Sequence, residues 1–243
     1  MEAQTTFKRY EVKYILTRRQ RDMLLQSMRG HLALDMYGRS TIRNIYFDTD
    51  SYRLVRDSIE KPLYKEKLRV RSYNPDGPDC ESFVELKKKY KGIVYKRRVV
   101  MTGRQAEAWL SGAAEPPEDS QMTREIQWFL RENRPSPKVL IACERTSWRS
   151  REDPELRITF DERIRWREKE LSFAAGSGGA LLLPNGEVLM ELKIPGAAPL
   201  WLAHLLSEQA LFPTSFSKYG VCYKNHLLQE YMQEYIKGEM ICV

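Results

Sequence analysis

The sequence predicts an α+β protein in which an antiparallel β-sheet closes into a barrel or tunnel, with helices at its periphery. In six strand-like segments every second position is charged, apart from Thr159 in the fifth segment, and apolar residues often lie between these positions. These segments are 9–13, 67–71, 85–87, 96–98, 157–161 and 191–193. Residues two apart on a strand share a face, so each strand has one charged and one apolar face. On one strand this pattern is also typical of the solvated face of an open sheet, but six such strands favour a barrel with a charged interior.

The hydrophobic pattern predicts the elements in chain order. Strands are expected over 7–16, 41–47, 64–73, 82–89, 93–101, 138–148, 156–165 and 187–194. Helices are expected over 18–30 with Thr17 as the N-cap, from a cap at 48–50 to 59, over 199–211 and over 218–237. A helical insert at about 103–134 holds two more, 103–111 and 120–132. Because the strands on both sides of this insert share one pattern, residues 1–243 are interpreted as a single domain.

The composition indicates which class of binding partner and which cellular compartment to expect. The 243 residues are 42% hydrophobic, and 40 basic against 33 acidic residues give a net charge of +7, which favours an anionic partner. Charge alone does not separate nucleic acid, nucleotides, polyphosphate and acidic membranes. The four cysteines lie far apart without a C-x-x-C pair, which argues against a zinc site. No apolar run resembles a signal peptide or approaches the roughly 18 residues of a membrane span, so a cytoplasmic protein is expected.

A basic barrel interior suits a chain of phosphates. Arginine binds phosphate oxygens with paired donors, and lysine supplies a compact charge. Carboxylates between the cations reduce their repulsion, and they can also hold Mg²⁺ or Mn²⁺ together with phosphate oxygens. Each carboxylate can equally form a salt bridge with a neighbouring cation. The candidates are Glu11, Glu85, Asp161 and Glu191.

Eight short segments carry a family resemblance through their ordered combination. They are FKRYEVKY at 7–14, IYFD at 45–48, LRVR at 68–71, FVELK at 83–87, ERT at 144–146, RITFD at 157–161, MELK at 190–193 and FSKY at 216–219. In this order they resemble the VTC domain, the polyphosphate polymerase domain of the CYTH-like triphosphate tunnel metalloenzyme superfamily. The superfamily often opens with Glu-x-Glu-x-Lys, and Arg9 in place of the first Glu is closer to the VTC branch than to the triphosphatases.

The resemblance implies a tunnel that binds ATP and polyphosphate or triphosphate, with Mn²⁺ or Mg²⁺ as the cofactor. The phosphate-binding residues that we expect are Lys13, Arg69, Arg71, Lys87, Lys96, Arg145, Arg157, Lys193 and Lys218. Among these, Arg69, Arg71, Lys87 and Lys218 are the expected catalytic residues. Glu191 is the metal ligand that the resemblance implies, and Glu85 and Glu11 are further metal candidates.

The functional hypothesis is a polymerase that transfers the terminal phosphate of ATP to a growing polyphosphate chain. A triphosphate hydrolase of the same fold and a non-enzymatic polyphosphate-binding module are the alternatives. The basic run at 87–91 raises a third alternative, RNA binding. Alternation places Lys87 and Lys88 on opposite faces, so a basic hairpin tip is the favoured interpretation of this run and no nucleic acid is expected.

Overall fold

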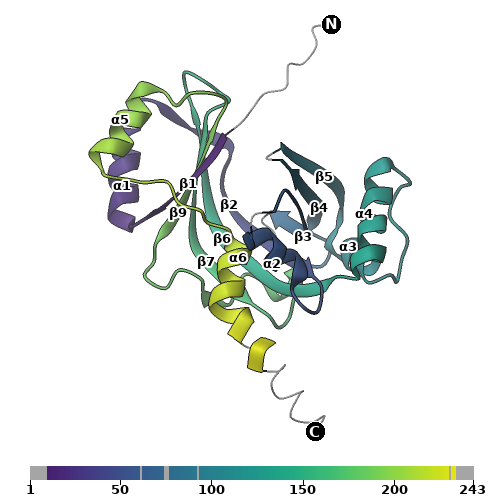
Figure 1. Cartoon of the computed structure of the whole chain (residues 1–243). Coiled ribbons are helices and arrows are strands. Elements are labelled where there is room, and N and C mark those ends of the chain that lie inside the picture. The colour runs from purple at the N-terminus through teal and green to yellow at the C-terminus, as the bar shows by residue number, and fades with distance from the viewer. Residues whose placement is uncertain (1–9, 61, 74–76, 92, 230, 234–243) are drawn as a thin grey trace, which may run out of the picture. The chain divides into compact units, whose positions relative to one another are not determined.

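The computed structural model describes residues 10–60, 62–73, 77–91, 93–229 and 231–233 (Figure 1). Among these residues, nine strands form one sheet in the order β1-β9-β7-β6-β2-β3-β4-β5, and β8 pairs with β7. The strands are β1 Tyr10–Leu16, β2 Leu32–Asp48, β3 Tyr64–Tyr73, β4 Glu81–Tyr90, β5 Ile93–Thr102, β6 Ser136–Ser150, β7 Arg157–Arg167, β8 Ala180–Leu181 and β9 Val188–Ile194. The α-helices are α1 Arg18–Ser27, α2 Arg53–Glu60, α3 Gly103–Leu110, α4 Gln121–Asn133, α5 Leu200–Glu208 and α6 Lys218–Cys222. The prediction of an α+β protein with a large antiparallel sheet is therefore confirmed.

Closure of the sheet into a tunnel stays a prediction. In the part of the chain that the structure describes, the strand order runs from β1 to β5 without a ladder that joins these two strands. The structure also contains no helix, within the described residues, that is long and apolar enough to cross a membrane.

The chain divides into two compact units. Unit 1 comprises residues 1–41, 143–164 and 183–216, and unit 2 comprises 42–142, 165–182 and 217–243. Strands β2, β6 and β7 contribute residues to both units. The interpretation of residues 1–243 as a single domain stays a prediction, and the units are described separately below.

Unit 1 places an apolar sheet face under two helices. In β1 and β9, Val12 is opposite Leu192 and Tyr14 is opposite Met190, and the same face of β7 adds Ile158 and Phe160. Helices α1 and α5 lie side by side over this face (Figure 1). The two helices contribute Leu24, Leu202 and Leu206 to the same buried cluster, and Met28, the C-cap of α1, also belongs to it. The other face of these strands is left for the charged residues.

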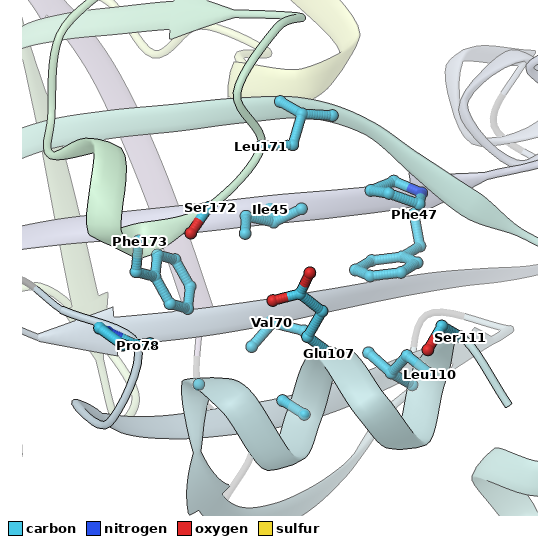
Figure 2. Close-up of a pocket in the computed structure, with 13 residues that line it drawn as sticks. Ile45, Phe47, Val70, Pro78, Glu107, Leu110, Ser111, Leu171, Ser172 and Phe173 are labelled. Atoms are coloured by element: carbon cyan, nitrogen blue, oxygen red, sulfur yellow. The ribbon is translucent and has the colours of Figure 1, made fainter. Parts of the chain in front are cut away.

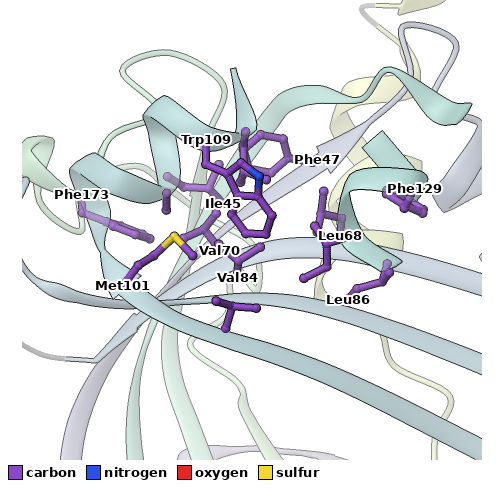
Figure 3. Packing of buried hydrophobic residues seen from close by; sticks show 14 of the residues in the cluster. Ile45, Phe47, Leu68, Val70, Val84, Leu86, Met101, Trp109, Phe129 and Phe173 are labelled. Atoms are coloured by element: carbon purple, nitrogen blue, oxygen red, sulfur yellow. The ribbon is translucent and has the colours of Figure 1, made fainter. Parts of the chain in front are cut away.

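Unit 2 repeats this arrangement with β3, β4 and β5. Leu68 is opposite Leu86, and Val70 is opposite Val84, which in turn is opposite Val99. Trp109 of α3 and Phe129 of α4 pack on these side chains (Figure 3). Alternation therefore directs the intervening charged residues of β3, β4 and β5 to the opposite face.

Most of the element boundaries follow local signals in the sequence. Thr17 caps α1 as predicted, because its side chain accepts a hydrogen bond from the Gln20 amide while the Gln20 side chain accepts one from the Thr17 amide. The largest differences from the predicted elements are in strand β2 and in the last helix. Strand β2 begins at Leu32, whereas the predicted strand begins at Thr41. The observed strand continues through Gly38, which has a positive φ of 47°. A glycine at such a position is also typical of a turn, so the sequence gives no sign that the strand extends this far.

The last helix also differs from its prediction. Helix α6 ends at Cys222, the π-helical turn Tyr223–Leu227 follows it, and residues 228–229 and 231–233 are again α-helical. The predicted start of the first strand, residues 7–9, and the predicted end of the last helix, residues 234–237, lie outside the described residues.

Because the strands of unit 2 have one buried and one exposed face, truncating side chains on the two faces should lower the free energy of unfolding by different amounts. Leu86 is fully buried in the apolar cluster, so Leu86→Ala should lower the free energy of unfolding by about 3 kcal/mol. Val100 is more than half exposed, so Val100→Ala should change it by less than about 0.5 kcal/mol. Urea unfolding followed by circular dichroism measures both, and equal losses would contradict the assignment of faces.

Candidate functional site

The charged face of unit 2 is built by strand register. Across β3, β4 and β5, one row consists of Lys67, Lys87 and Lys96, and the next row consists of Arg69, Glu85 and Arg98. Residues directly opposite each other lie within contact distance of long side chains. The register therefore gathers five cations around a single carboxylate.

The carboxylate of Glu85 is the centre of this face. It is 1% exposed, and the Arg69 Nε atom donates to its Oε2 atom at 2.8 Å. The Arg98 Nε atom donates to Oε1 at 2.8 Å, and the Lys96 Nζ atom lies 2.5 Å from the same oxygen. The Arg71 Nε atom lies 4.0 Å from Oε2. Four cations thus share one buried negative charge.

Neighbouring polar groups orient the two arginines of β3. The Arg71 Nε atom donates to Asn44 Oδ1 at 2.9 Å, and its Nη1 atom donates to the Tyr73 hydroxyl at 3.0 Å. The Arg69 Nη1 atom lies 3.5 Å from the hydroxyl of Tyr46, its register partner on β2. These contacts hold the guanidinium groups in place, which lowers the entropy that a ligand would otherwise lose on binding.

The excess of positive charge shifts the pKa values of Glu85 and Lys96. Burial alone would raise the pKa of the Glu85 carboxyl, but Arg69, Arg71 and Lys96 outweigh burial and hold the pKa far below its usual range. Burial lowers the pKa of Lys96, and the nearby Arg98 and Arg69 lower it further, so that the pairing with Glu85 does not restore the ordinary value. An ammonium that is destabilised beside its own counter-ion indicates a face that would gain from an added anion.

The segment that carries Lys218 lies against the same unit. The Lys67 Nζ atom donates to the hydroxyl of Ser217, which is the N-cap of α6. The Tyr219 hydroxyl donates at 2.9 Å to the buried Asp48 carboxylate, which also accepts hydrogen bonds from backbone amides at the start of α2. Burial raises the pKa of Asp48, and these hydrogen bonds oppose that shift. Asp48 and Lys67 therefore fix the residues on either side of Lys218.

Unit 1 has a different charged face, with more carboxylates. The Arg145 guanidinium donates to both oxygens of Asp161, at 2.5 and 2.6 Å, and to the Glu191 Oε2 atom at 3.2 Å. The Lys13 Nζ atom lies 3.5 Å from Glu191 and 3.2 Å from Glu11. Lys13 also donates to a backbone carbonyl, that of residue 216. The three carboxylates here are thus bridged by cations.

Register places the two remaining predicted cations beside this cluster. Lys193 of β9 is opposite Glu11 of β1 on one side and Arg157 of β7 on the other. In the adjacent row, Glu191 is opposite Lys13 and Thr159. The charged face of unit 1 is therefore a ladder of alternating signs, whereas that of unit 2 is dominated by cations.

The carboxylates differ in how well they fit a divalent metal. Glu85 does not fit, because both of its oxygens are engaged by arginine and lysine and a metal ion there would face four cations. Glu191 and Glu11 fit better, since their contacts with Arg145 and Lys13 are longer, at 3.2 to 3.5 Å, and Mg²⁺ and Mn²⁺ take one or two carboxylates together with phosphate oxygens and water. Among the described residues no group of three or more His, Cys, Asp or Glu side chains forms a metal cage. The metal assignments stay predictions, and these contacts argue against the assignment of Glu85.

The predicted site residues thus fall into two groups, one in each unit. Unit 2 holds Arg69, Arg71, Glu85, Lys87, Lys96 and Lys218, and unit 1 holds Glu11, Lys13, Arg145, Arg157, Glu191 and Lys193. The sequence-based list omits Arg98, which binds Glu85, and Lys67, which binds Ser217. Both could have been found from the alternation, because each lies two positions from a predicted cation. The partners of Arg98 and Lys67 could not be found in this way, since these partners lie in other segments of the chain.

An apolar cavity of about 190 Å³ lies in unit 2, away from the Glu85 row (Figure 2). It is lined by Ile45, Phe47, Val70, Leu110 and Phe173 together with neighbouring residues, and Glu107 of α3 is the charged side chain of this lining. Val70 belongs to the apolar face of β3, so the cavity opens on the core side of the sheet. It does not contain the cations that the sequence predicts for phosphate binding.

The fold and the charged faces define an α+β protein whose large antiparallel sheet presents rows of cations on one face. More specifically, the chain belongs to the VTC domain family, whose model matches residues 8–226, so the predicted family is confirmed. A candidate adenylate cyclase from Bacillus halodurans has a similar fold, with a TM-score of 0.53 and 13% identity over 85% of this chain and 92% of that one. A candidate adenylyl cyclase from Hippeastrum, described as having a dominant triphosphatase activity, gives a TM-score of 0.52 and 15% identity over 88% and 94%. No curated protein matches the sequence.

Removal of the Glu85 charge should destabilise unit 2 in the absence of a ligand. Glu85→Gln leaves Arg69, Arg98 and Lys96 without their shared counter-ion, so the free energy of unfolding at neutral pH should fall by about 3 kcal/mol. Tripolyphosphate supplies negative charge to the same cations and should raise the melting temperature of this variant more than that of the wild type. Thermal unfolding with and without tripolyphosphate measures both effects, and an unchanged melting temperature in the free variant would contradict the role of Glu85.

The low pKa of Glu85 predicts that its contribution to stability is lost in acid. The pKa of Glu85 is lower in the folded protein than the value of about 4.3 in an unfolded chain. Its contribution to stability is therefore complete above pH 4.3 and is lost as the pH falls through the lower folded pKa. Wild type should lose stability relative to Glu85→Gln as the pH is lowered below about 4. Parallel pH–stability curves for the two proteins would show that Glu85 is not held ionised in this way.

Proposed function

We propose that the protein is a metal-dependent polyphosphate polymerase, which transfers the terminal phosphate of ATP to a growing polyphosphate chain in a closed, basic tunnel. The observation that carries this proposal is the cluster of Arg69, Arg71, Lys96 and Arg98 around the single buried charge of Glu85. Such a cluster suits a ligand with one negative charge at each repeating unit. Membership of the VTC domain family supports the same class of ligand.

In this mechanism the protein contributes position and charge. A terminal oxygen of the polyphosphate chain attacks the γ-phosphorus of ATP, a new P–O bond forms, and the bond to the β-phosphate breaks to release ADP. Arg69, Arg71 and Lys87 hold the phosphate oxygens in line and offset the charge that moves to the leaving group. Lys218, which Ser217 and Tyr219 hold in place from either side, contacts the chain of phosphates. No protein nucleophile is required.

Glu191 and Glu11 are the residues that would hold Mn²⁺ or Mg²⁺. The ion, when bound, would neutralise phosphate charge during transfer. Lys13 and Arg145 form ion pairs with Glu191. When a metal ion occupies this carboxylate, the two cations would be available to bind phosphate oxygens instead. The proposed setting is the cytoplasm, where ATP is abundant.

A triphosphate hydrolase is the second candidate. The solved Hippeastrum protein of similar fold is described as a triphosphatase, which supports hydrolysis as an activity that this architecture can carry. In that reaction water replaces the polyphosphate chain as the attacking group, while the cations keep the same roles. A binding module without turnover is the third candidate.

Product analysis separates these functions. Purified protein is incubated with γ-labelled ATP and Mn²⁺, and the labelled products are resolved by size. A ladder of lengthening polyphosphate is the result that we expect. Labelled free phosphate alone would identify the hydrolase, and unchanged ATP together with a melting temperature raised by tripolyphosphate would identify the binding module.

Single substitutions then test the assigned residues. Arg69→Ala, Lys87→Ala and Glu191→Ala should each lower turnover at least about a hundredfold while the protein stays folded, because each removes a group that positions phosphate or metal. Arg104→Ala is the matched control, since Arg104 is an exposed arginine that pairs with Asp79. Near-normal rates in the three site variants would contradict the proposed mechanism.

A further inference from the structure

The tip of the β4–β5 hairpin carries an exposed apolar patch. Tyr64, Tyr90 and Ile93 lie opposite one another in a single row across β3, β4 and β5. Leu63 is held beside this row, because its carbonyl accepts a hydrogen bond from the Lys91 amide at 2.9 Å. Leu63 is 72% exposed and Ile93 is 58% exposed, although both are aliphatic. These four residues, with the half-exposed Tyr95, are called the tip patch below.

Positive charge lies beside the tip patch. Segments 63–67, 87–91 and 93–96 contain seven lysines and one acidic residue, Glu66. Lys88 shares the face of the tip patch and Lys91 follows Tyr90 at the end of β4, whereas alternation places the other five lysines on the opposite face of the sheet. The Glu66 carboxylate is already engaged, since the Tyr64 hydroxyl donates to it at 2.6 Å and the Lys88 Nζ atom lies 3.6 Å away. The Lys91 Nζ atom lies 5.3 Å from the centre of the Tyr90 ring, so the charge lies directly beside the patch.

We propose that the tip patch docks this protein on an anionic membrane surface. Tyrosine rings suit the boundary between headgroups and acyl chains, and exposed Leu and Ile side chains gain by entering the acyl region. Lysines beside them are attracted to anionic lipids. The hairpin thus combines the two contributions, apolar insertion and electrostatic attraction, that stable peripheral binding requires.

Other occupants account for fewer of these features. Single-stranded RNA would use the lysines and the tyrosine rings, but it gives no reason for two exposed aliphatic side chains. A second copy of the chain would bring like charges together at a two-fold contact. Lys96, Arg97 and Arg98 of β5 also oppose the addition of another strand.

Vesicle flotation tests this inference on the full chain. We expect the protein to float with vesicles that contain phosphatidylglycerol but not with vesicles of phosphatidylcholine alone, and the bound fraction should fall as salt is raised. Leu63→Ser and Ile93→Ser should each weaken binding roughly tenfold, through lost apolar burial. Lys91→Ala should weaken binding about fivefold.

Two controls separate the tip patch from the rest of the basic surface. Leu200→Ser removes an aliphatic residue that is 77% exposed in unit 1, and it should leave vesicle binding unchanged. Arg98→Ala removes a cation of the Glu85 cluster and should also leave vesicle binding almost unchanged, whatever its effect on ATP turnover. Full binding by Ile93→Ser, or no flotation with anionic vesicles, would overturn the inference. A gel shift of short RNA that requires Tyr90 and Lys91, without flotation, would assign the patch to nucleic acid instead.

Discussion

One buried carboxylate constrains the charged face of unit 2. Glu85 lies between Arg69, Arg98, Lys96 and Arg71, and without it these cations would repel one another within a few ångströms. One negative charge is enough to hold the empty face together but too little to neutralise it. The face is therefore stabilised in the absence of a ligand and keeps an excess of positive charge, which supports the proposed binding of a polyanion.

The alternation of each strand links this face to the core. In both units the same strands bury apolar side chains beneath helices on one face and present charge on the other. The two charged faces are not equivalent. Unit 2 has an excess of cations around Glu85, which suits phosphate oxygens, while unit 1 combines cations with Glu191 and Glu11, the carboxylates for which a metal-binding role is proposed.

Much of this arrangement could be predicted because the information is local. The two-residue period fixes which side chains share a face, so the apolar and charged faces of β3 and β4 follow from the sequence, as does the capping of α1 by Thr17. Interactions between distant segments could not be predicted in this way. The contacts of Glu85 with Arg98, of Lys67 with Ser217 and of Tyr219 with Asp48 depend on which strands and helices meet. The metal role predicted for Glu85 stays a prediction that its contacts argue against, and those contacts could not be read from the sequence, because a carboxylate among cations gives no sign of which ones it binds.

The most direct test of the account is calorimetric titration of tripolyphosphate into the wild type, Arg69→Ala and the control Arg104→Ala, at several salt concentrations. We predict saturable binding to the wild type and the control that weakens as salt is raised, and a loss of at least about tenfold in affinity for Arg69→Ala. Equal affinity of all three proteins, or no binding to the wild type, would contradict the claim that the cations around Glu85 form a polyanion site.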